Sequence, residues 1–597
     1  MERRTFLTTL AGAPLAAAPQ SVPASLVRWT RDEDTRLYTQ AHCGGTPLVY
    51  RGGWGLLTAR VKPEGACQVS LAHRLLRSGR GGEDILEAEL AIRNASREQR
   101  ALEVSFATSA HPTEAFGRER AHLPFTAGAH AVLRSLGKIE TLDCDRHIGR
   151  PGENAAGFSA DYLEPFATEP AVTDVRRLLL IPLADIYHPE IPWRIALFAS
   201  PLRPWGVAAT SEPRGEGGWT FTTKVVVPAG GEVREKCYLF VHEGDAPIAW
   251  RAFHDIAFPD REPRPGWLQN AHVHYYDFLG PGEDGRRGAG YDLDVGHFRE
   301  FHVGMATQHG YYPVLGDYLK PGRDRWMAMT SDLHGACEMS VEKMRARVKA
   351  TRAAGTKAAI YLHTAGFDSA SPCAAALRDS QLTYADGKTY PYAWQGPETV
   401  GELWHMSIAS QAWRQHLLDQ ARNVMEMIRP DAIVLDETFG GLGYDFHRDR
   451  RGPLSPHMIG FLRDLRALVH SYGTDKALLT SDCALANFVM WADGEGGDHA
   501  YGSLLGNEFY RKAPVRYMAA LGARRWLPCA WQFTQFWNYQ MDLARKTGAG
   551  VGVSNGWIEY TGLHRLHPKL RARLIADIET LATRRGAASG EGALTRT

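Results

Sequence analysis

Carboxylic acids and aromatic rings follow a series of short apolar segments in the second half of the chain. The clearest case is PDAIVLDETFGG at 430–441, where the apolar run 432–435 leads directly into Asp436 and Glu437. Cleavage of a glycosidic bond uses two carboxyl groups, because one protonates the leaving oxygen while the other attacks the anomeric carbon or activates water. Flat aromatic side chains can stack on the C–H faces of sugar rings. The pattern therefore indicates chemistry on a carbohydrate.

The elements that must position these residues are apolar segments that alternate with helical patterns. Eight strand candidates lie at 271–278, 311–318, 357–364, 431–438, 476–482, 487–493, 524–531 and 550–555. Between the third and fourth, apolar residues recur at helical spacing from Trp413 to Ile428, and Pro430 ends the helix. Strands that are apolar on both faces and are followed by helices predict a parallel sheet. Eight of them predict a (β/α)8 TIM barrel at 268–583, with a last helix from about His567 to Leu581.

The active site of such a barrel lies at the C-terminal ends of its strands. Strand four ends in Asp436 and Glu437, and strand six leads into Asp493, Glu495 and Asp498. The loop at 365–407 is long and aromatic, which predicts that it walls one side of the site. The candidates for substrate binding at these ends and loops are Asp277, Asp317, His363, Asp482, Trp394, Trp404, Trp491, Trp531 and Trp557.

Residues 21–256 show a different pattern, with a period of two. Apolar residues alternate with polar ones over 86–93 and again over 102–106, which predicts a hairpin with one solvated face. An N-terminal antiparallel β-sandwich is the expected architecture, and the proline-rich segment 257–267 is the expected linker. The chain is thus predicted to be multidomain, a β-sandwich followed by the barrel. The small, polar residues 584–597 are predicted to be a disordered tail.

The chain begins with a charged start, a short apolar run and small residues, which predicts a signal peptide at 1–20. Arg3 and Arg4 are followed by Thr-Phe-Leu, as in twin-arginine signals, so we expect export to the periplasm or the extracellular space. No later segment has the length of apolar sequence that a membrane helix needs. The eight cysteines are scattered, which argues against a zinc knuckle or a disulfide-dense scaffold and leaves one or two disulfides or buried thiols open.

The 68 basic and 67 acidic residues balance to a net charge of +1, which gives no electrostatic footprint for nucleic acid. We predict a carbohydrate as partner, no cofactor and no metal, and the oligomeric state stays open. An alternative metal-dependent amidohydrolase reading starts from His272 and His274 on strand one. Strand eight, however, offers Asn555 where such a site needs an Asp.

A β-sandwich followed by a (β/α)8 barrel with Asp at the end of strand four resembles the retaining α-glycosidases of the α-galactosidase clan. The resemblance implies that Asp436 is the nucleophile and that Asp493 is the acid/base, with Glu437, Glu495 and Asp498 as alternative acids. It implies a retaining, two-carboxylate glycoside hydrolase. Val434 stands where α-galactosidases carry a lysine, so glycoside hydrolysis is implied more strongly than galactose specificity.

Two further alternatives remain open. The adjacent pair Asp436 and Glu437 is similar to the Asp-Glu pair of substrate-assisted hexosaminidases, in which Glu is the acid and Asp orients an acetamido group; the His-x-Gly-Gly that precedes that pair is missing here. The other alternative is a secreted, non-catalytic glycan-binding protein, which would keep the aromatic residues and lose its dependence on the acids.

Overall fold

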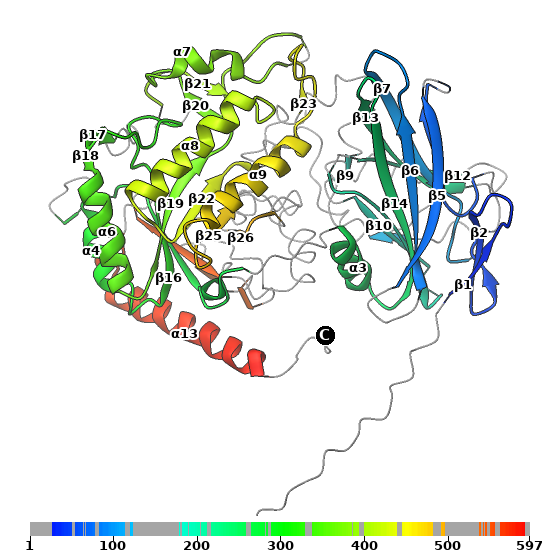
Figure 1. Ribbon diagram of the computed structural model, residues 1–597. Coiled ribbons are helices and arrows are strands. Elements are labelled where there is room, and N and C mark those ends of the chain that lie inside the picture. Colours follow the sequence, from blue (N-terminus) through cyan, green and yellow to red (C-terminus); the bar gives the residue numbers. More distant parts are fainter. Residues whose placement is uncertain are drawn as a thin grey trace, which may run out of the picture.

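The computed structural model describes the parts of the chain that carry most of the predicted elements. The described residues are 27–113, 178–257, 264–480, 491–495, 550–555 and 562–590, with short gaps inside the first three ranges, and isolated residues at 120–122, 537–538, 541 and 544–545. Figure 1 shows two groups of elements, an antiparallel one made of the early strands and an α/β one made of the later elements.

Two antiparallel sheets form the first group. The six-stranded sheet has the order β5 (Gln68–Arg77), β6 (Glu83–Arg93), β14 (Glu232–Glu243), β11 (Trp193–Ala199), β10 (Leu183–Tyr187), β8 (Arg120–His122). The five-stranded sheet has the order β4 (Thr58–Lys62), β7 (Arg100–Thr108), β13 (Gly217–Val227), β12 (Trp205–Ser211), β9 (Leu178–Leu179). A small sheet of β1 (Val27–Arg31), β2 (Tyr38–Cys43) and β3 (Thr46–Pro47) lies beside them.

The two large sheets share one buried hydrophobic core. Leu86, Leu90 and Ile92 of β6 and Val104 and Phe106 of β7 all belong to this core. The prediction that these two segments pair as a hairpin was wrong, because β6 pairs with β5 and β14, whereas β7 pairs with β4 and β13. The chain crosses from one sheet to the other between them. Alternating apolar residues look the same in both arrangements, since they report which face is buried and not which strand is the neighbour.

The outer face of the six-stranded sheet is buried as well. Helix α3 (Pro247–Ala257) places Trp250 and Phe253 in a cluster with Phe198 and Phe240, which lie on the sheet face opposite the shared core. Phe198 and Phe253 meet edge to face with ring centroids 5.7 Å apart. The six-stranded sheet is therefore the middle layer between the five-stranded sheet and α3.

Seven parallel strands form the sheet of the second group. Their order is β26 (Gly494–Glu495), β25 (Ala477–Thr480), β22 (Ala432–Asp436), β19 (Lys357–His363), β16 (Val303–Gln308), β15 (Val273–Asp277), β27 (Val551–Asn555). Strands β15, β19, β22, β25 and β27 fall within five of the predicted segments. The first strand, β15, pairs with β16 on one side and with the last strand, β27, on the other.

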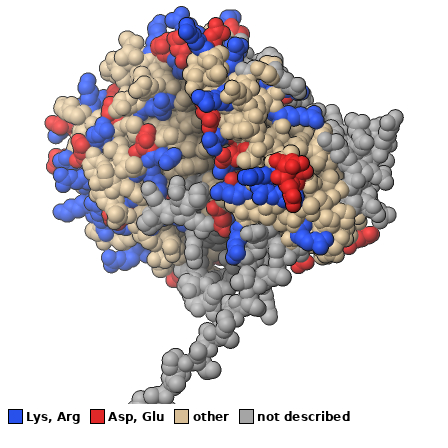
Figure 2. Space-filling view, turned by 45° about the vertical axis from the view of Figure 1, so that its right-hand side comes forward, with Lys and Arg blue, Asp and Glu red and all other residues tan. Residues whose placement is uncertain are grey.

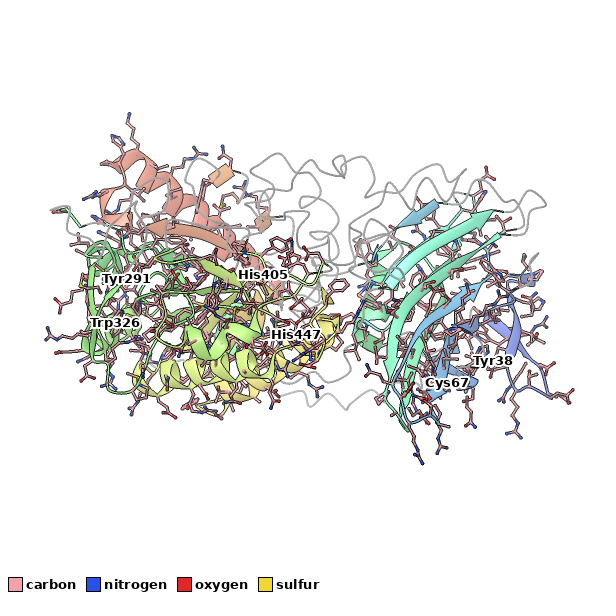
Figure 3. All side chains as sticks on the ribbon, turned by 90° about the horizontal axis from the view of Figure 1, so that it is seen from above. Tyr38, Cys67, Tyr291, Trp326, His405 and His447 are labelled. Atoms are coloured by element: carbon pink, nitrogen blue, oxygen red, sulfur yellow. The ribbon has the colours of Figure 1, made fainter. Side chains whose placement is uncertain are left out.

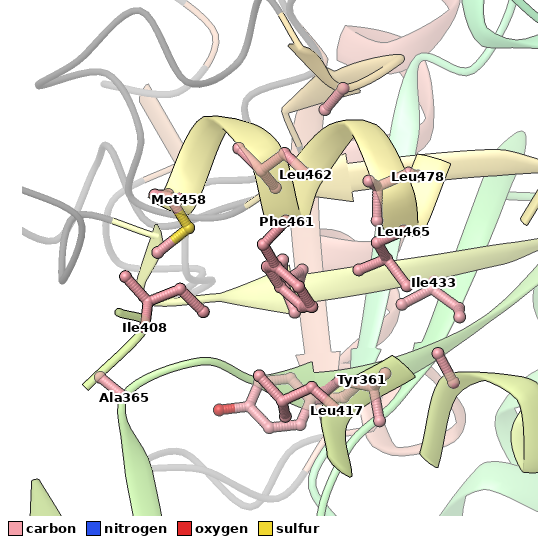
Figure 4. Close-up of a cluster of buried hydrophobic side chains, with 14 of the residues drawn as sticks. Tyr361, Ala365, Ile408, Leu417, Ile433, Met458, Phe461, Leu462, Leu465 and Leu478 are labelled. Carbon is pink, nitrogen blue, oxygen red and sulfur yellow. The ribbon is translucent and has the colours of Figure 1, made fainter. Parts of the chain in front are cut away.

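Helices cover this sheet. Helix α8 (Gln411–Met427) begins at Ser410, whose side chain accepts a hydrogen bond from the Trp413 N–H, and it ends before Pro430 as predicted. Helix α9 (Ser455–His470) lies beside α8 and presents Phe461 and Leu465 to Ile433 of β22 (Figure 4). In the described part of this group the other helices are α4 (Gly290–Asp294), α6 (Val341–Ala353), α7 (Ala374–Leu377) and α13 (Pro568–Gly590).

Short elements fill the connections of the second group. The 3-10 turns among the described residues are η3 (Gly266–Gln269), η4 (Val295–His297), η5 (Arg378–Ser380) and η11 (Leu563–Arg565). The two-stranded sheets pair β17 (Arg325–Ala328) with β18 (Cys337–Ser340), β20 (Gly366–Asp368) with β21 (Leu403–His405), and β23 (Tyr444–Asp445) with β24 (Gly452–Pro453).

Three further sequence predictions, all in the second half of the chain, differ from the structure. The second parallel strand is β16, and the predicted segment 311–318 is a loop with one isolated bridge between Val314 and Asp317. The sixth strand begins at Gly494, just after the predicted segment 487–493, of which 487–490 lie outside the described residues. Helix α13 continues to Gly590 and so includes the start of the tail predicted to be disordered. The predicted seventh strand, at 524–531, also lies outside the described residues.

Charges of both signs are interspersed on the face seen in Figure 2. Within the described part of the chain, no helix is both long and apolar enough to span a membrane.

Candidate active site

Asp436 is the last residue of β22, and its side chain is held on the inner face of the parallel sheet. The residue is 7% exposed. The Tyr361 hydroxyl donates to Oδ2 over 2.7 Å, and the Glu437 N–H donates to Oδ1 over 2.9 Å. Tyr361 comes from the neighbouring strand β19, where it is two residues before His363, the register partner of Asp436. Both oxygens of the carboxylate are thus oriented by short hydrogen bonds.

A layer of buried rings lies beside Tyr361. The centroids of the His309 and Tyr361 rings are 3.8 Å apart, and Tyr276, Phe278 and Tyr312 also contact the His309 ring. Burial, followed by the charge of His363, lowers the pKa of His309 well below its usual value, so this imidazole is neutral. Burial and the charge of Asp436 raise the pKa of the Tyr361 hydroxyl well above its usual value. Tyr361 therefore stays a hydrogen-bond donor to Asp436 at all ordinary pH values.

Glu437 follows Asp436 in a left-handed backbone conformation with φ of 53°. Its Oε2 lies 3.3 Å from Nε2 of His363, the last residue of β19. Nδ1 of His363 accepts the N–H groups of Ala365 (3.1 Å) and Gly366 (2.8 Å), which orients the ring with Nε2 towards Glu437. The structure thus brings Asp436, Glu437 and His363 together at the ends of two neighbouring strands.

Asp493 lies in a different place from Asp436. It is fully buried and accepts from Nε and Nη2 of Arg466 (2.9 and 2.8 Å), Nε2 of His470 (2.8 Å) and the Leu478 N–H (2.8 Å). Arg466 and His470 are on α9, which packs on the outer face of the sheet.

The level of Asp493 along the strands differs as well. Its N–H bonds to Leu478, the register partner of Ile433, so Asp493 is about 10 Å below the level of Asp436 at ~3.3 Å per residue. The Asp493 carboxylate takes part in an ion-pair cluster between helix and strand, and its assignment as acid/base stays a prediction.

Asp277 also faces the helices. It shares its face of β15 with Val273 and Tyr275, which pack in a core with Phe298 and Leu574. Its register partners are Gln308 and Asn555, and all three side chains are fully buried.

Arg347 of α6 reaches the row that these three residues form, with Nη1 3.6 Å from the Asp277 carboxylate. Among the described residues, no hydrogen-bond partner meets the side-chain atoms of Asp277, Gln308 and Asn555. The structure therefore places this predicted substrate-binding acid behind the strand, away from Asp436.

The other predicted residues fall in several places. Asp317 is in the loop after β16 and forms a two-pronged ion pair with Arg323 (2.8 and 3.1 Å). Trp404 is buried against Phe367, and Trp491 packs, partly buried, against the core of the α/β group. Glu495 ends β26 and is described by its backbone. Five predicted residues lie outside the described part of the chain: Trp394, Asp482, Asp498, Trp531 and Trp557.

The long loop at 365–407 contains β20, β21 and α7 and has its own order. The Tyr384 hydroxyl lies 2.8 Å from Nδ1 of His405, and the Tyr392 ring meets that of His363 edge to face at 5.6 Å. Figure 3 shows His405 near the middle of the α/β group, whereas Tyr291 lies on its far side from the antiparallel sheets. The Tyr392–His363 contact connects this loop with the end of β19.

Sequence reasoning missed Tyr361, Thr364 and His309. Tyr361 is on β19, Thr364 directly follows β19, and His309 directly follows β16. Tyr361 could have been found from strand alternation, since it lies on the same face as His363. His274 lies on the inner face, with Nε2 2.6 Å from the Thr307 hydroxyl, and burial lowers its pKa to about 3. Within the described ranges, no three His, Cys, Asp or Glu side chains are grouped as metal ligands would be.

No family model matches the chain, and no curated protein matches it in sequence. Solved structures match it in fold. An α-galactosidase from Lactobacillus brevis is 10% identical with a TM-score of 0.53, and the match covers 95% of this chain and 70% of that one.

The GH36 α-galactosidases AgaA and AgaB from Geobacillus stearothermophilus are each 8% identical, with TM-scores of 0.52 and 0.51. Those matches cover 89% and 91% of this chain and 74% of each relative. The chain thus shares the fold of the α-galactosidase clan, as its sequence resemblance implies.

Proposed function

We propose that the protein is a glycoside hydrolase whose nucleophile is Asp436. The observation that carries the proposal is the carboxylate at the end of the fourth parallel strand, buried and oriented by Tyr361 and by the Glu437 N–H. A nucleophile in a retaining glycosidase must keep one geometry towards the anomeric carbon through two steps, and two short hydrogen bonds supply that restraint. Solved structures of the same fold include AgaA in complex with raffinose, an oligosaccharide.

The proposal includes a closed (β/α)8 barrel. The seven described strands follow chain order from β15 to β26, and β27 pairs back onto β15. One further strand between β26 and β27 would complete the ring, and the segment 524–531 is the candidate. In a closed barrel the end of β26 comes back towards the same opening as the end of β22.

The proton donor is proposed to be Glu495 or Asp498. Glu495 is the register partner of Thr480, which in turn pairs with Leu435, so it is only one residue below the level of Asp436. Asp498 comes three residues later. Asp493 is set aside for this role because its carboxylate already accepts hydrogen bonds from Arg466 and His470.

The proposal and its two alternatives differ in the substrates that they predict. A substrate-assisted hexosaminidase would require N-acetyl sugars, and a glycan-binding protein would bind without turnover.

We also propose that residues 1–20 direct export, so that the protein meets its substrate outside the cytoplasm. Culture fractions from a strain expressing the full chain, with and without Arg3→Lys and Arg4→Lys, test the export step.

The catalytic proposal is tested by a screen of p-nitrophenyl α- and β-glycosides, with proton NMR on each hit to give the anomeric outcome. Asp436→Asn is expected to lower kcat by at least about 10⁴-fold while the melting temperature stays close to that of the parent, since loss of a covalent nucleophile removes the easier two-step route. Asp475→Asn is the matched control, because the Asp475 side chain is 61% exposed at the opposite ends of the strands. Full activity of Asp436→Asn would refute the assignment.

A further inference from the structure

The backbone at Glu437 is strained in a way that the strand does not require. Among the described residues, only five other than glycine have a positive φ, and two of them flank β22: Arg429 with φ of 59° before the strand and Glu437 with φ of 53° after it. A side chain with a Cβ disfavours this region, and glycine adopts it freely. Strained residues of this kind cluster at ligand sites, where the strain sets the direction of a side chain.

The strain changes the face on which the Glu437 carboxylate lies. Along a regular strand, Glu437 would follow Leu435 to the outer face, where Leu435 is buried under the helices. The left-handed turn instead brings Oε2 to 3.3 Å from Nε2 of His363. His363 lies on the same face as Tyr361, the residue that bonds to Asp436. Two consecutive carboxylates therefore reach the same side of the sheet.

The end of β19 and the residues that follow it fix the backbone of Asp436 and Glu437. The Thr364 hydroxyl lies within hydrogen-bonding distance of the carbonyl oxygens of both Asp436 (2.8 Å) and Glu437 (2.7 Å), and its N–H donates to the first of them. The His363 ring is fixed by the N–H groups of Ala365 and Gly366. The position of the carboxylate is thus specified by several contacts that a solvated, incidental side chain would not have.

The same carboxylate has unused hydrogen-bonding capacity. Oε2 of Glu437 is buried, and no described residue makes a hydrogen bond to it within ordinary geometry, although His363 is near. An ionised carboxylate only accepts hydrogen bonds, so an oxygen in this position suits a hydroxyl donor. Sugar ring hydroxyls are such donors, and Asp436 lies one residue away.

We propose that Glu437, positioned by His363, binds a ring hydroxyl of the sugar unit that Asp436 attacks and so determines which sugars are accepted. The inference rests on the proposed glycosidase function and adds a specificity-determining contact to it. It differs from the hexosaminidase alternative, in which Glu437 would donate the proton to the leaving group.

The first test compares Glu437→Gly with Arg429→Gly. The two substitutions release the same kind of backbone strain on either side of β22, so each is expected to raise the melting temperature by about 1 °C. On the best p-nitrophenyl glycoside from the screen, Glu437→Gly is expected to lose about 100-fold in kcat/KM, whereas Arg429→Gly keeps parental activity. Equal activity of the two variants, or a lower melting temperature for Glu437→Gly, would overturn the proposal.

The second test identifies the hydroxyl. Monodeoxy analogues of the same glycoside are assayed with the parent and with Glu437→Gly. At one ring position, removal of the hydroxyl is expected to lower kcat/KM of the parent about 100-fold and kcat/KM of the variant less than about threefold. The variant already lacks the carboxylate that binds this hydroxyl, so it has no contact left to lose. Additive losses at every position would contradict the proposal. A variant rate restored by a 2,4-dinitrophenyl leaving group would identify Glu437 as the proton donor and would also overturn it.

A third measurement separates this proposal from the function on which it rests. If no glycoside is hydrolysed by the parent, the hydrolase proposal fails, and binding is measured instead. Galactose and 1-deoxygalactonojirimycin are titrated against Asp436→Asn and against Asp436→Asn/Glu437→Gln by calorimetry. At least tenfold weaker binding to the double variant supports the contact, and equal affinities refute it whatever the catalytic result.

Discussion

Replacement of Asp277 by Asn is expected to stabilise the protein at neutral and alkaline pH. Asp277 is fully buried between β15 and the helices, beside Gln308 and Asn555. Burial raises the pKa of its carboxyl from 3.8 to about 7; the Arg347 guanidinium opposes this rise, while Asp292 and Asp294 add to it. The charged form is therefore costly in the folded protein, and Asn has the shape of the protonated acid without that cost.

The sign and size of this pH effect follow from the protonation of Asp277 in the folded and the unfolded protein. Between about pH 4 and pH 7 the unfolded chain releases the Asp277 proton while the folded protein keeps it, so stability falls as pH rises and is constant above about pH 7. One pKa unit corresponds to about 1.4 kcal/mol, which gives a total loss of about 4 kcal/mol. From about pH 5 to about pH 8 the parent should lose roughly 2.5 kcal/mol relative to Asp277→Asn.

Urea unfolding of the parent and of Asp277→Asn, near pH 5 and near pH 8, measures this difference. At each pH, the free energy of unfolding of the parent is subtracted from that of Asp277→Asn, and the two differences are compared. The other titrating groups are the same in both proteins, so their contributions cancel. Asp475→Asn, an exposed replacement, is expected to give no such change. A pH-independent difference between parent and Asp277→Asn would refute the burial argument. A large loss of kcat/KM with unchanged stability would instead return Asp277 to the substrate site.

Two other replacements test the assignments around the site. Asp493→Asn removes the carboxylate charge that pairs with Arg466, so it is expected to lower the free energy of unfolding by about 3 kcal/mol and to leave kcat of the folded enzyme nearly unchanged; loss of kcat with an unchanged melting temperature would show that Asp493 is catalytic. Tyr361→Phe removes one hydrogen bond to Asp436 but keeps the ring, so kcat is expected to fall roughly 10- to 100-fold while thermal unfolding is little altered; an unchanged kcat would show that the hydroxyl does not orient the nucleophile.

Periodicity in the sequence predicted most of the parallel sheet. The strands that contain Tyr276, Tyr361 and Asp436 and the helix from Gln411 to Met427 were found, because long apolar runs and a proline stop leave few alternatives. The second strand was missed: its segment, VGMATQ, is short and mixed, and the aromatic stretch from Tyr311 that was chosen instead has its apolar rings buried in a loop. Apolar content reports burial, and burial is not limited to strands.

The residues of the candidate site were predicted only in part, because the sequence shows which residues end a strand but not which face of the sheet they lie on. Asp436 and His363 end neighbouring strands and meet, as a strand-end rule requires. Asp277 also ends a strand, but it is on the opposite face, next to residues that pack under helices. The sequence around Asp277 contains Tyr275 and Tyr276, which are equally aromatic, so its pattern did not reveal which face is the inner one.

The contrast between Asp436 and Asp493 shows what makes a strand-end acid available for chemistry. Both are buried and both accept hydrogen bonds, but the partners differ in charge and origin. Asp493 forms an ion pair with Arg466 and a hydrogen bond with His470, both from a helix that packs on the sheet, so its carboxylate joins helix to strand. Asp436 accepts hydrogen bonds from a tyrosine hydroxyl of the neighbouring strand and from the N–H of the next residue, and both orient the carboxylate.

A carboxylate that is oriented by uncharged groups can stabilise a positive centre that develops in the reaction, as the anomeric carbon does in glycoside cleavage. The charge of the hydrogen-bond partners therefore distinguishes the two acids, although both follow short apolar segments in the sequence. Glu437 lies beside Asp436 on this side of the sheet, with its Oε2 3.3 Å from Nε2 of His363. Asp436 and Glu437 are thus consecutive carboxylates that reach the same side and the same end of the sheet.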